Sequence, residues 1–500
     1  MSYSQCRVRT STASRWISSR LLTARRSAHA TTCAVPALDN ISLRNSLNGG
    51  STTLSRRAGG EPLTWYSCGP TVYDSAHLGH ARTYICTDIV RRVTMDYFDI
   101  KVRYAMGITD IDDKIIQRAQ QSGRNWKELA QHFEKDFKGD MRALNVLPPD
   151  AYLAVTDHIP DIIAYIQGVI DAGYGYVASD GVYFSVAKLG SKYGSLGRGT
   201  SDGPEASDGI STTIESTGKR SPKDFALWKV STDGIGSGSS GPPPVWESPW
   251  GLGRPGWHIE CSAMTHARFG PQLDIHSGGI DLLFPHHTNE IAQWYFLLCL
   301  SLTTYNVSLL YSTAHNNCDD WTRYWVHTGH LHIDGCKMSK SLKNFISIKD
   351  YLSYGWTSRP ADDLRIYFLH HKYHSTLHFS KDRIEEAAVY RHRIENFFEL
   401  IKKLQEQDEE RECMRWVEVN SVQDLARVLN EIEAAVRTAL RTDYDTPVVM
   451  KLLADLVSMA TPVIRTCLTD KSVPVHTIYS AHKFVKSILS TFGLKFIEVC

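Results

Sequence analysis

Apolar positions just after residue 60 predict a buried strand and then a helix. The run "PLTWYSCG" (residues 62–69) is short and mostly apolar, which is typical of a strand inside a parallel sheet. From His77 onward the apolar residues Ile85, Ile89 and Val93 recur four residues apart, so they share one face of a helix.

A second strand and a second helix follow directly. The segment "KVRYAMGI" (residues 101–108) predicts a strand, and "TDIDDKIIQRAQQ" predicts a helix with Thr109 or Asp110 as its N-cap. The order strand, glycine turn, helix, strand, helix is that of a parallel α/β sheet. We therefore expect the first part of the chain to adopt an α/β fold.

The middle of the chain mixes packed segments with polar ones. Residues 197–217 and 231–244 are rich in Gly, Ser, Asp and Pro, which predicts surface insertions. Between them, "KRSPKDFALWK" is apolar enough to be packed. Further on, "QLDIHSGG" predicts a strand that leads into the helix-like "HHTNEIAQ".

From about Ser380 the pattern changes to long amphipathic helices. Four apolar stripes recur at helical spacing. Their members are Ile394, Phe397, Phe398, Ile401 and Leu404; Val422, Leu425, Leu429, Ile432, Val436 and Leu440; Val449, Leu452, Leu453 and Leu456; and Phe484, Val485, Ile488 and Phe492. The stripes predict the core of a helical bundle and carry no information about function.

One apolar segment stands apart from this pattern. Residues 291–318 contain no Asp, Glu, Lys or Arg, so their centre is a weak candidate for a membrane span. The segment carries Thr, Ser and Asn throughout and interrupts the α/β part. We favour an insertion at residues 294–314 and expect no stable membrane association.

The N-terminus and the net charge bear on location and partners. The first 38 residues hold six arginines and seven serines but no acidic residue, which is typical of a mitochondrial transit peptide; a disordered basic tail is the alternative. The chain has 55 basic and 54 acidic residues, and without the six arginines 49 basic residues remain, a net charge of −5. Net charge therefore gives no argument for nucleic-acid binding, and any RNA contact must come from local patches.

The cysteines do not suggest disulfides. There are eleven, an odd number without paired spacing, and in a mitochondrial matrix protein they should be reduced. Cys68 in "YSCGPTVYDSAHLGH" is therefore a free thiol, a metal ligand or a small core residue, and its local sequence leaves these alternatives open.

Two short motifs suggest chemistry with phosphates. In "HLGH", Gly79 would let a ligand approach the start of a helix, and His77 and His80 could contact phosphate oxygens. In "KMSKS", Lys337 and Lys340 could neutralise pyrophosphate. Alone, "HLGH" is weak evidence, since core histidines could give it by chance, and a lone lysine pair of this spacing favours a solvated basic loop.

In combination, "HLGH" and "KMSKS" resemble the two ATP-binding motifs of class I aminoacyl-tRNA synthetases. The chain from Trp65 to the C-terminal helices more specifically resembles the cysteinyl-tRNA synthetase family, of the mitochondrial type. The segments that carry this likeness are "CGPTVYDSAHLGH", "GITDIDDKII", "RPGWHIECSAM", "LDIHSGGIDLLFPHHTNEIAQ" and "GHLHIDGCKMSKSLKN".

The resemblance implies an α/β fold with a Rossmann-like parallel-sheet catalytic domain, followed by a C-terminal α-helical bundle. The expected parts are a transit peptide (residues 1–38), a connector (39–60), a catalytic domain (61–379) with insertions at 197–217, 231–244 and 294–314, and a helical domain that contacts tRNA (380–500).

The resemblance also implies one zinc ion held by Cys68, Cys261, His286 and Glu290. Two thiolates, an imidazole and a carboxylate suit zinc, and His286 and Glu290 are four residues apart on one helix face. Cys68 and Cys261 are 193 residues apart, so spacing alone would not have revealed the site.

Further roles follow from the same resemblance. Thr109, Trp257, Gly69 and Asp281 would bind the amino acid; His77, Gly79, His80 and Lys340 would bind ATP, and Lys337 would act with them in catalysis. His276 and His287 could belong to a histidine cluster at the pocket floor or could be structural. The acids of "TDIDDK" could bind magnesium or could serve the start of a helix.

The implied activity is the ATP-dependent activation of L-cysteine, with Mg²⁺, and its transfer to tRNA(Cys) in the mitochondrial matrix. Zinc would bind the substrate sulfur and so reject serine. A related ligase that joins cysteine to an amino sugar, or an inactive RNA-binding paralogue, are the alternatives. Leu78 and Thr288 depart from the family pattern, but neither is one of the four ligands.

Overall fold

The computed structural model describes residues 41–55, 60–194, 196, 218–231, 244–294, 321–333, 336–337, 345–408, 420–470 and 475–498. All of them belong to one compact unit, Leu38–Cys500. The predicted transit peptide and the insertion at 197–217 lie outside the described residues. Of the insertions at 231–244 and 294–314, only the end residues Ser231, Pro244 and Trp294 are described.

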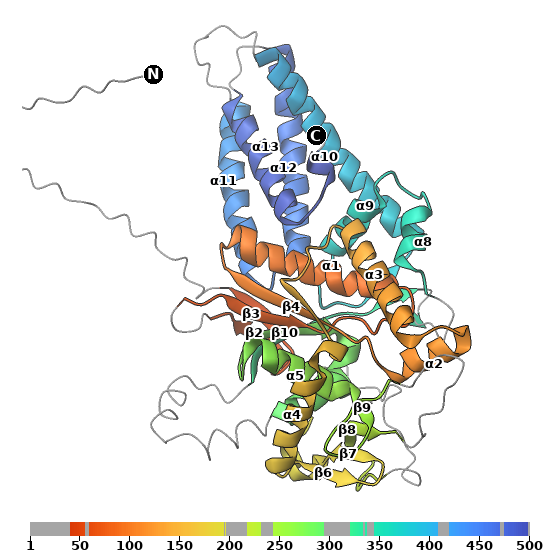
Figure 1. Ribbon diagram of the computed structural model, residues 1–500. Coiled ribbons are helices and arrows are strands. Elements are labelled where there is room, and N and C mark those ends of the chain that lie inside the picture. Colours follow the sequence, from red (N-terminus) through yellow and green to blue (C-terminus); the bar gives the residue numbers. More distant parts are fainter. Residues whose placement is uncertain are drawn as a thin grey trace, which may run out of the picture. The chain divides into compact units, whose positions relative to one another are not determined.

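A sheet of five parallel strands forms the centre of the α/β part (Figure 1). Its strand order is β11-β10-β3-β4-β5, and every pair is parallel. The strands are β3 (Leu63–Ser67), β4 (Val102–Ile108), β5 (Ala151–Ala154), β10 (Leu273–Gly279) and β11 (Thr322–Thr328). The parallel α/β fold and the three strands predicted from the sequence are confirmed.

Helices cover both faces of this sheet (Figure 1). Successive side chains of a strand point to opposite faces, so Trp65 and Tyr104 pack in one core with α1 (Leu78–Arg92). Their neighbours Tyr66 and Ala105 pack in a second core with α5 (Trp257–Phe269). The strands are buried on both faces, which explains why they are continuous apolar runs rather than alternating ones.

The helix predicted from His77 onward is α1. Its apolar face is the expected one, since Ile85, Ile89 and Val93 are all buried. His77 is the N-cap, and a π-helical turn, Val93–Tyr97, continues the helix at its end.

The predicted N-cap of the second helix was wrong. The helix is α2 (Asp113–Ser122), and the side chain of Asp112 caps it by accepting a hydrogen bond of 2.8 Å from the Lys114 N–H. Asp110 instead accepts hydrogen bonds from the N–H and hydroxyl of Thr156, while the Thr109 N–H donates to Pro70. Residues 109 and 110 therefore join neighbouring strand ends, and the helix begins later.

A smaller antiparallel sheet with order β6-β7-β8-β9 lies between β5 and β10 in the sequence. Its strands are β6 (Gly175–Ala178), β7 (Gly181–Phe184), β8 (Phe225–Val230) and β9 (Gly253–Pro255). Helices α3 (Trp126–Ala143) and α4 (Ile159–Asp171) flank β5 in sequence. Phe225, Leu227 and Trp228 are buried, so the prediction that "KRSPKDFALWK" is packed is confirmed.

The predicted connector contains a β-hairpin that the sequence did not suggest. Strands β1 (Ser42–Asn45) and β2 (Gly50–Thr53) are antiparallel. The Ser46 N–H donates to the Trp325 carbonyl on β11, and the Asp443 N–H donates to the Ser42 carbonyl. The hairpin therefore bridges the central sheet and the connection between the bundle helices that end at Arg441 and begin at Thr446.

A three-stranded sheet and two helices lead from the central sheet to the helical part. The strands are β12 (Leu331–Ile333), β13 (Cys336–Lys337) and β14 (Leu377–Phe379), in the order β13-β12-β14. Helices α8 (Ile348–Ser353) and α9 (Pro360–Leu369) lie between β13 and β14 in sequence.

Four helices form the predicted C-terminal bundle (Figure 1): α10 (Lys381–Asp408), α11 (Asn420–Arg441), α12 (Thr446–Thr469) and α13 (His476–Thr491). Most members of the predicted stripes are buried together, so the bundle core is confirmed. Among the described helices, α12 alone has the length and hydropathy of a membrane span, but this is weak evidence because its apolar residues fill the bundle core.

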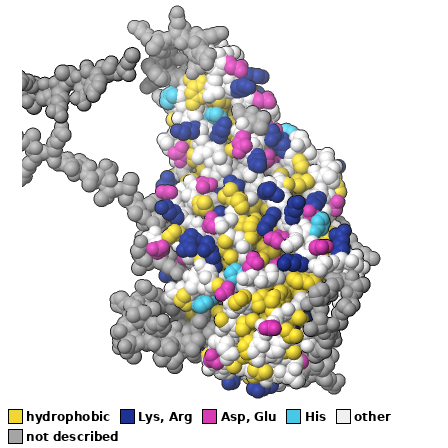
Figure 2. Space-filling model, viewed as in Figure 1, with side chains coloured by type: hydrophobic (Ala, Val, Ile, Leu, Met, Phe, Trp, Pro, Cys, Tyr) yellow, Lys and Arg dark blue, Asp and Glu magenta, His cyan; other side chains and the backbone are white. Residues whose placement is uncertain are grey.

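Acidic and basic side chains are intermixed on the face seen in Figure 2. This agrees with the near-neutral net charge of +1 for the whole chain.

Candidate metal centre and nucleotide motifs

The candidate site lies where the strand order of the central sheet reverses. From β3 the chain continues outward to β4 and β5, whereas β10 and β11 lie on the other side of β3. In such sheets ligands bind outside the carboxyl ends of the strands at this switch point. Cys68 follows β3, Thr109 follows β4, and Asp281 follows β10, so residues distant in sequence meet at this edge.

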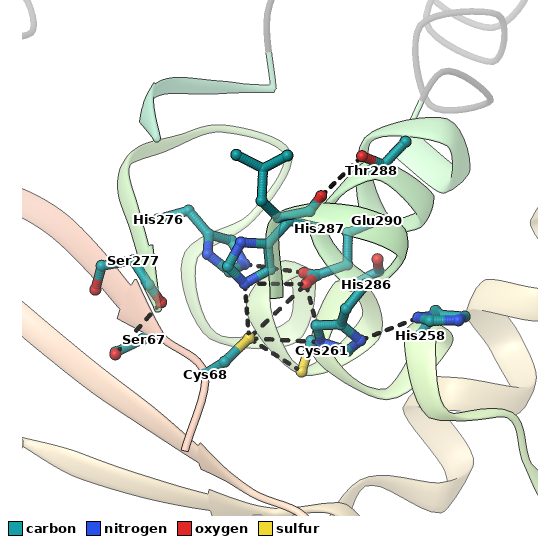
Figure 3. Close-up of polar contacts among 12 residues, drawn as sticks. Ser67, Cys68, His258, Cys261, His276, Ser277, His286, His287, Thr288 and Glu290 are labelled. Carbon is teal, nitrogen blue, oxygen red and sulfur yellow. Dashed lines mark hydrogen bonds and ion pairs between the residues drawn. The ribbon is translucent and has the colours of Figure 1, made fainter. Parts of the chain in front are cut away.

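The structure brings the four predicted metal ligands together (Figure 3). The Cys68 Sγ lies 3.7 Å from the Cys261 Sγ and 3.5 Å from the His286 Nε2. The Glu290 Oε1 lies 3.8 Å from the Cys68 Sγ and 3.2 Å from the His286 Nε2. All four side chains are buried. Their spacing leaves the donor atoms facing a common point, as a metal site requires.

Two more histidines extend this cluster. Cys68, His276, His287 and Glu290 form a second set whose donor atoms also lie within 4.8 Å of one another. The His276 Nε2 is 2.9 Å from the Glu290 Oε2, and the His287 Nε2 is 3.4 Å from the Cys68 Sγ. Both histidines therefore lie at the cluster, on the side of the Cys68 sulfur and the second Glu290 oxygen.

Burial and hydrogen bonding shift the pKa values of the cluster residues. Desolvation raises the pKa of Cys68 and of Glu290 and lowers the pKa of His286, while the hydrogen bond from Cys68 lowers the pKa of Cys261 to about 6. Cys68 and Glu290, which are costly to ionise at this buried point, are groups that a divalent cation would stabilise in ionised form, and Cys261 ionises there more readily. The residues therefore fit a metal ion, and their donor types are those that zinc prefers.

Two further histidines contact the ring nitrogens of His286 and His287. The His287 Nδ1 is 2.7 Å from the His327 Nε2, and the His258 Nδ1 is 3.0 Å from the His286 Nδ1. Burial lowers the pKa of both His258 and His327 to about 3, so both are neutral. The sequence analysis missed His258 and His327. His258 lies inside "RPGWHIECSAM" and His327 lies shortly before "GHLHIDG", but only the packing of α5 and the register of β10 and β11 bring them here.

The two "HLGH" histidines hold one another at the start of α1. The His80 N–H donates to the His77 Nδ1, and the His77 N–H donates to the His80 Nδ1, so they form a reciprocal capping box. Their rings stack at 4.0 Å. A Cβ on Gly79 would lie 2.8 Å from the His77 ring, which explains the glycine between them. Their role toward ATP stays a prediction.

The "KMSKS" motif lies largely outside the described residues. Lys337 is described as part of β13, where it pairs with His332, but Lys340 is not described. The segment that follows the motif returns to "HLGH", because the Leu78 N–H donates to the Ile346 carbonyl at 3.0 Å. Ser347 also forms a β-bridge with His77. The flank of one motif therefore contacts the other motif directly.

Residues 55–389 match the family model described as tRNA synthetases class I (C) catalytic domain. The chain is 40% identical over 462 residues to "Cysteine--tRNA ligase, cytoplasmic" of Dictyostelium discoideum, which covers 90% of this chain. It is 38% identical over 440 residues to "Probable cysteine--tRNA ligase, mitochondrial" of Xenopus tropicalis, which covers 86% of this chain. The chain belongs to the cysteine–tRNA ligase family.

The chain spans 65% of the length of the Dictyostelium protein and 69% of the Xenopus protein. Among solved structures, a Mycobacterium tuberculosis methionyl-tRNA synthetase in complex with methionyl-adenylate resembles it with a TM-score of 0.61. That likeness covers 87% of this chain and 91% of the other, at 16% identity, and it shows the class I synthetase fold alone.

Of the four residues that the family resemblance places at the amino acid, two adjoin the cluster. Trp257 is the first residue of α5, is 37% exposed and stacks on His286 at 4.4 Å. Gly69 follows Cys68, and a Cβ there would lie 1.8 Å from the Gly107 carbonyl oxygen. Thr109 is buried, and Asp281 is exposed in the turn after β10. Trp257 and Gly69 thus adjoin the metal ligands, and the substrate roles of all four remain predictions.

Thr288, which departs from the family pattern, has a local structural role. Its hydroxyl donates to the Leu283 carbonyl at 2.8 Å, within the turn that carries His286 and His287. The side chain is therefore used by the backbone of its own turn, and Glu290 keeps its place in the cluster.

Proposed function

We propose that this chain is a cysteine–tRNA ligase. The carboxylate of L-cysteine attacks the α-phosphorus of ATP, the bond to pyrophosphate breaks, and cysteinyl-adenylate forms. A hydroxyl of the terminal ribose of tRNA(Cys) then attacks the cysteinyl carbonyl, loses its proton, and AMP departs. The observation that carries this proposal is the buried set of Cys68, Cys261, His286 and Glu290 at the switch point of a class I synthetase fold.

We infer that these four residues hold a zinc ion. When bound, zinc supplies a site that prefers a thiolate to a neutral hydroxyl, which shape alone would discriminate poorly. The protein orients that site: Glu290 accepts on its second oxygen from His276, and Trp257 covers the ring of His286. Selection of cysteine over serine would then need no separate editing step.

The nucleotide would lie at the start of α1. The positive end of the helix dipole favours phosphate at this position, where His77 and His80 also lie. We propose that His77 and His80 stabilise charge on the reacting phosphates, that Lys337 and Lys340 neutralise the pyrophosphate, and that ATP binds with Mg²⁺. The enzyme needs no nucleophile of its own, because the attacking group is the carboxylate of the substrate.

We further propose that this protein is located in the mitochondrial matrix. The arginine-rich, acid-free N-terminus and the similarity to a relative named as mitochondrial support this location. The proposed parts are those expected from the sequence: transit peptide 1–38, connector 39–60, catalytic domain 61–379 and tRNA-contacting helical domain 380–500.

The test is the variant Cys68→Ser, with Cys86→Ser as its control. Cys86 is also a buried free cysteine, but it lies on α1 beside Arg82, away from the cluster. We expect Cys68→Ser to lose bound zinc, measured by atomic absorption, and to lose cysteine-dependent ATP–pyrophosphate exchange, while Cys86→Ser keeps both.

Full zinc content and normal exchange in Cys68→Ser would refute the metal assignment. Exchange measures only the first step, so charging of tRNA(Cys) is measured as well. A wild-type protein that catalyses exchange but does not charge tRNA(Cys) would refute the proposed acceptor.

A further inference from the structure

A chain of hydrogen bonds leads from the metal cluster to the β1–β2 hairpin. The His287 Nε2 lies 3.4 Å from the Cys68 Sγ, and the His287 Nδ1 lies 2.7 Å from the His327 Nε2. The His327 Nδ1 lies 2.8 Å from the Ser46 Oγ. All four residues are buried, so water does not compete for these contacts.

This series of hydrogen bonds has one donor-to-acceptor direction that suits a sulfur ligand. A neutral imidazole carries one N–H and one acceptor nitrogen, and burial favours the neutral form. If the Ser46 hydroxyl donates to His327, then His327 donates to His287, and His287 donates to the Cys68 sulfur. Donors behind a metal ligand fix its orientation and tune its basicity.

The hairpin itself is held at fixed positions. The Ser46 N–H donates to the Trp325 carbonyl at 2.9 Å, and the Asn45 Oδ1 accepts from the Trp325 N–H at 3.0 Å. The neighbouring residue of β1, Arg44, donates its N–H to the Asp443 Oδ1 at 2.7 Å. Hydrogen bonds that do not involve the histidines therefore place Ser46.

We propose that Ser46 is a positioning residue of the amino-acid site. It sets the tautomer and ring orientation of His327 and His287, and His287 then holds the Cys68 sulfur in place as a metal ligand. The inference rests on the proposed function in that the cluster is taken as the cysteine site. No residue of the hairpin is part of the predicted site, so this assigns a function to a segment expected to be a mere connector.

The experiment compares Ser46→Ala, Ser46→Thr and Asn48→Ala in the full chain. Asn48 is the matched control, since it lies exposed in the turn of the same hairpin, and its hydrogen bonds within the described part of the chain go to Thr52 and Gly50 of that hairpin. The readouts are the rate of zinc loss to EDTA, the absorption spectrum of the Co²⁺-loaded protein, and the KM values for cysteine and ATP in pyrophosphate exchange.

Ser46→Ala should lose zinc about tenfold faster, shift the Co²⁺ bands and raise the KM for cysteine about tenfold, with the KM for ATP unchanged. Ser46→Thr keeps the hydroxyl and should restore all three values, and Asn48→Ala should match wild type. His327→Gln breaks the chain at the next link and should reproduce the losses of Ser46→Ala, which provides a second variant if Ser46→Ala folds poorly.

Wild-type zinc retention, Co²⁺ spectrum and cysteine KM in Ser46→Ala would overturn the inference. So would equal losses in Ser46→Ala and Asn48→Ala that affect both KM values, because the hairpin would then only support the fold. A wild-type protein without cysteine-dependent exchange would defeat the proposed function instead. The zinc-loss and Co²⁺ measurements would still decide the role of Ser46.

Discussion

At the scale of single residues, the backbone beside the candidate site leaves no room for a side chain at position 69. Gly69 follows the metal ligand Cys68, and a Cβ at this position would lie 1.8 Å from the carbonyl oxygen of Gly107 on β4. Because the obstacle is backbone at the centre of a parallel sheet, it cannot rotate away as a flexible side chain would. The glycine therefore allows Cys68 to approach the end of β4.

We expect Gly69→Ala to destabilise the protein by about 1–3 kcal/mol or more, because the strand ends must separate to admit the methyl group. Gly139→Ala is the control. An added Cβ there meets nothing within 4 Å on helix α3, so it should stabilise the fold by about 0.5–1 kcal/mol. Urea unfolding measures both, and equal midpoints for Gly69→Ala and wild type would contradict the close approach.

The same scale shows why the site could be predicted only in part from the sequence. His286 and Glu290 share a helix face that spacing reveals, but Cys68 and Cys261 meet through sheet order, and the family resemblance alone had paired them. His327 depends on the register of two neighbouring strands, since it pairs with Gly278. No local pattern encodes such a register, so this residue was missed.

At the scale of elements, local periodicity predicted helices and strands well but not their ends or their partners. The stripe of Ile85, Ile89 and Val93 gave α1, whereas the N-cap of α2 was misplaced because Asp110 bonds to Thr156, 46 residues away. The hairpin at 42–53 was missed because its residues are mostly polar and its partners lie some 280 to 400 residues later.

Helix α3 carries a buried carboxyl group, Asp140, whose ionisation changes the stability of the protein. Desolvation raises the pKa of Asp140 to about 6, with Lys349 lowering it and Asp136 raising it further. One Asp140 carboxylate oxygen is buried without a hydrogen-bond partner among the described residues. Since the pKa in the folded state lies above that of the unfolded chain, the stability that the protonated form contributes is lost as the pH rises through about 6.

We expect Asp140→Asn to remove this loss, because the amide cannot ionise. Its thermal midpoint should exceed that of wild type at about pH 7.5, and the two should converge toward about pH 4. Asp136→Asn serves as control, since Asp136 forms an ion pair of 2.6 Å with Lys349, and its loss should give no gain. A lower midpoint for Asp140→Asn at about pH 7.5 would show that the ionised carboxylate is stabilising.

At the scale of the whole molecule, a buried arginine joins the helix that begins with "HLGH" to the end of the helical bundle. Arg365 on α9 forms an ion pair of 2.7 Å with Asp88 on α1. Its other hydrogen bonds go to the carbonyl groups of Leu144, Asn145 and Phe492, the last of which follows α13. One guanidinium therefore contacts α1, the end of α3 and the end of the bundle.

Arg365→Met should remove one partner of Asp88, which keeps its ion pair of 2.9 Å with Arg92, together with the donors to the Leu144 and Phe492 carbonyl groups. Leaving buried acceptors without donors costs about 1–3 kcal/mol, which is the expected loss. Arg365→Lys keeps the charge but not the planar fork that reaches several carbonyl groups at once, so its loss should be intermediate. Arg383→Met is the matched control, because Arg383 pairs with Glu386 on the surface of α10, and its unfolding midpoint should equal that of wild type. The midpoints of urea unfolding of the three variants test this expected order of stability. If Arg365→Met unfolded at the same urea concentration as Arg383→Met, the contacts of Arg365 would not stabilise the protein, and the junction between the sheet and the bundle would have to depend on its apolar contacts and on the hairpin.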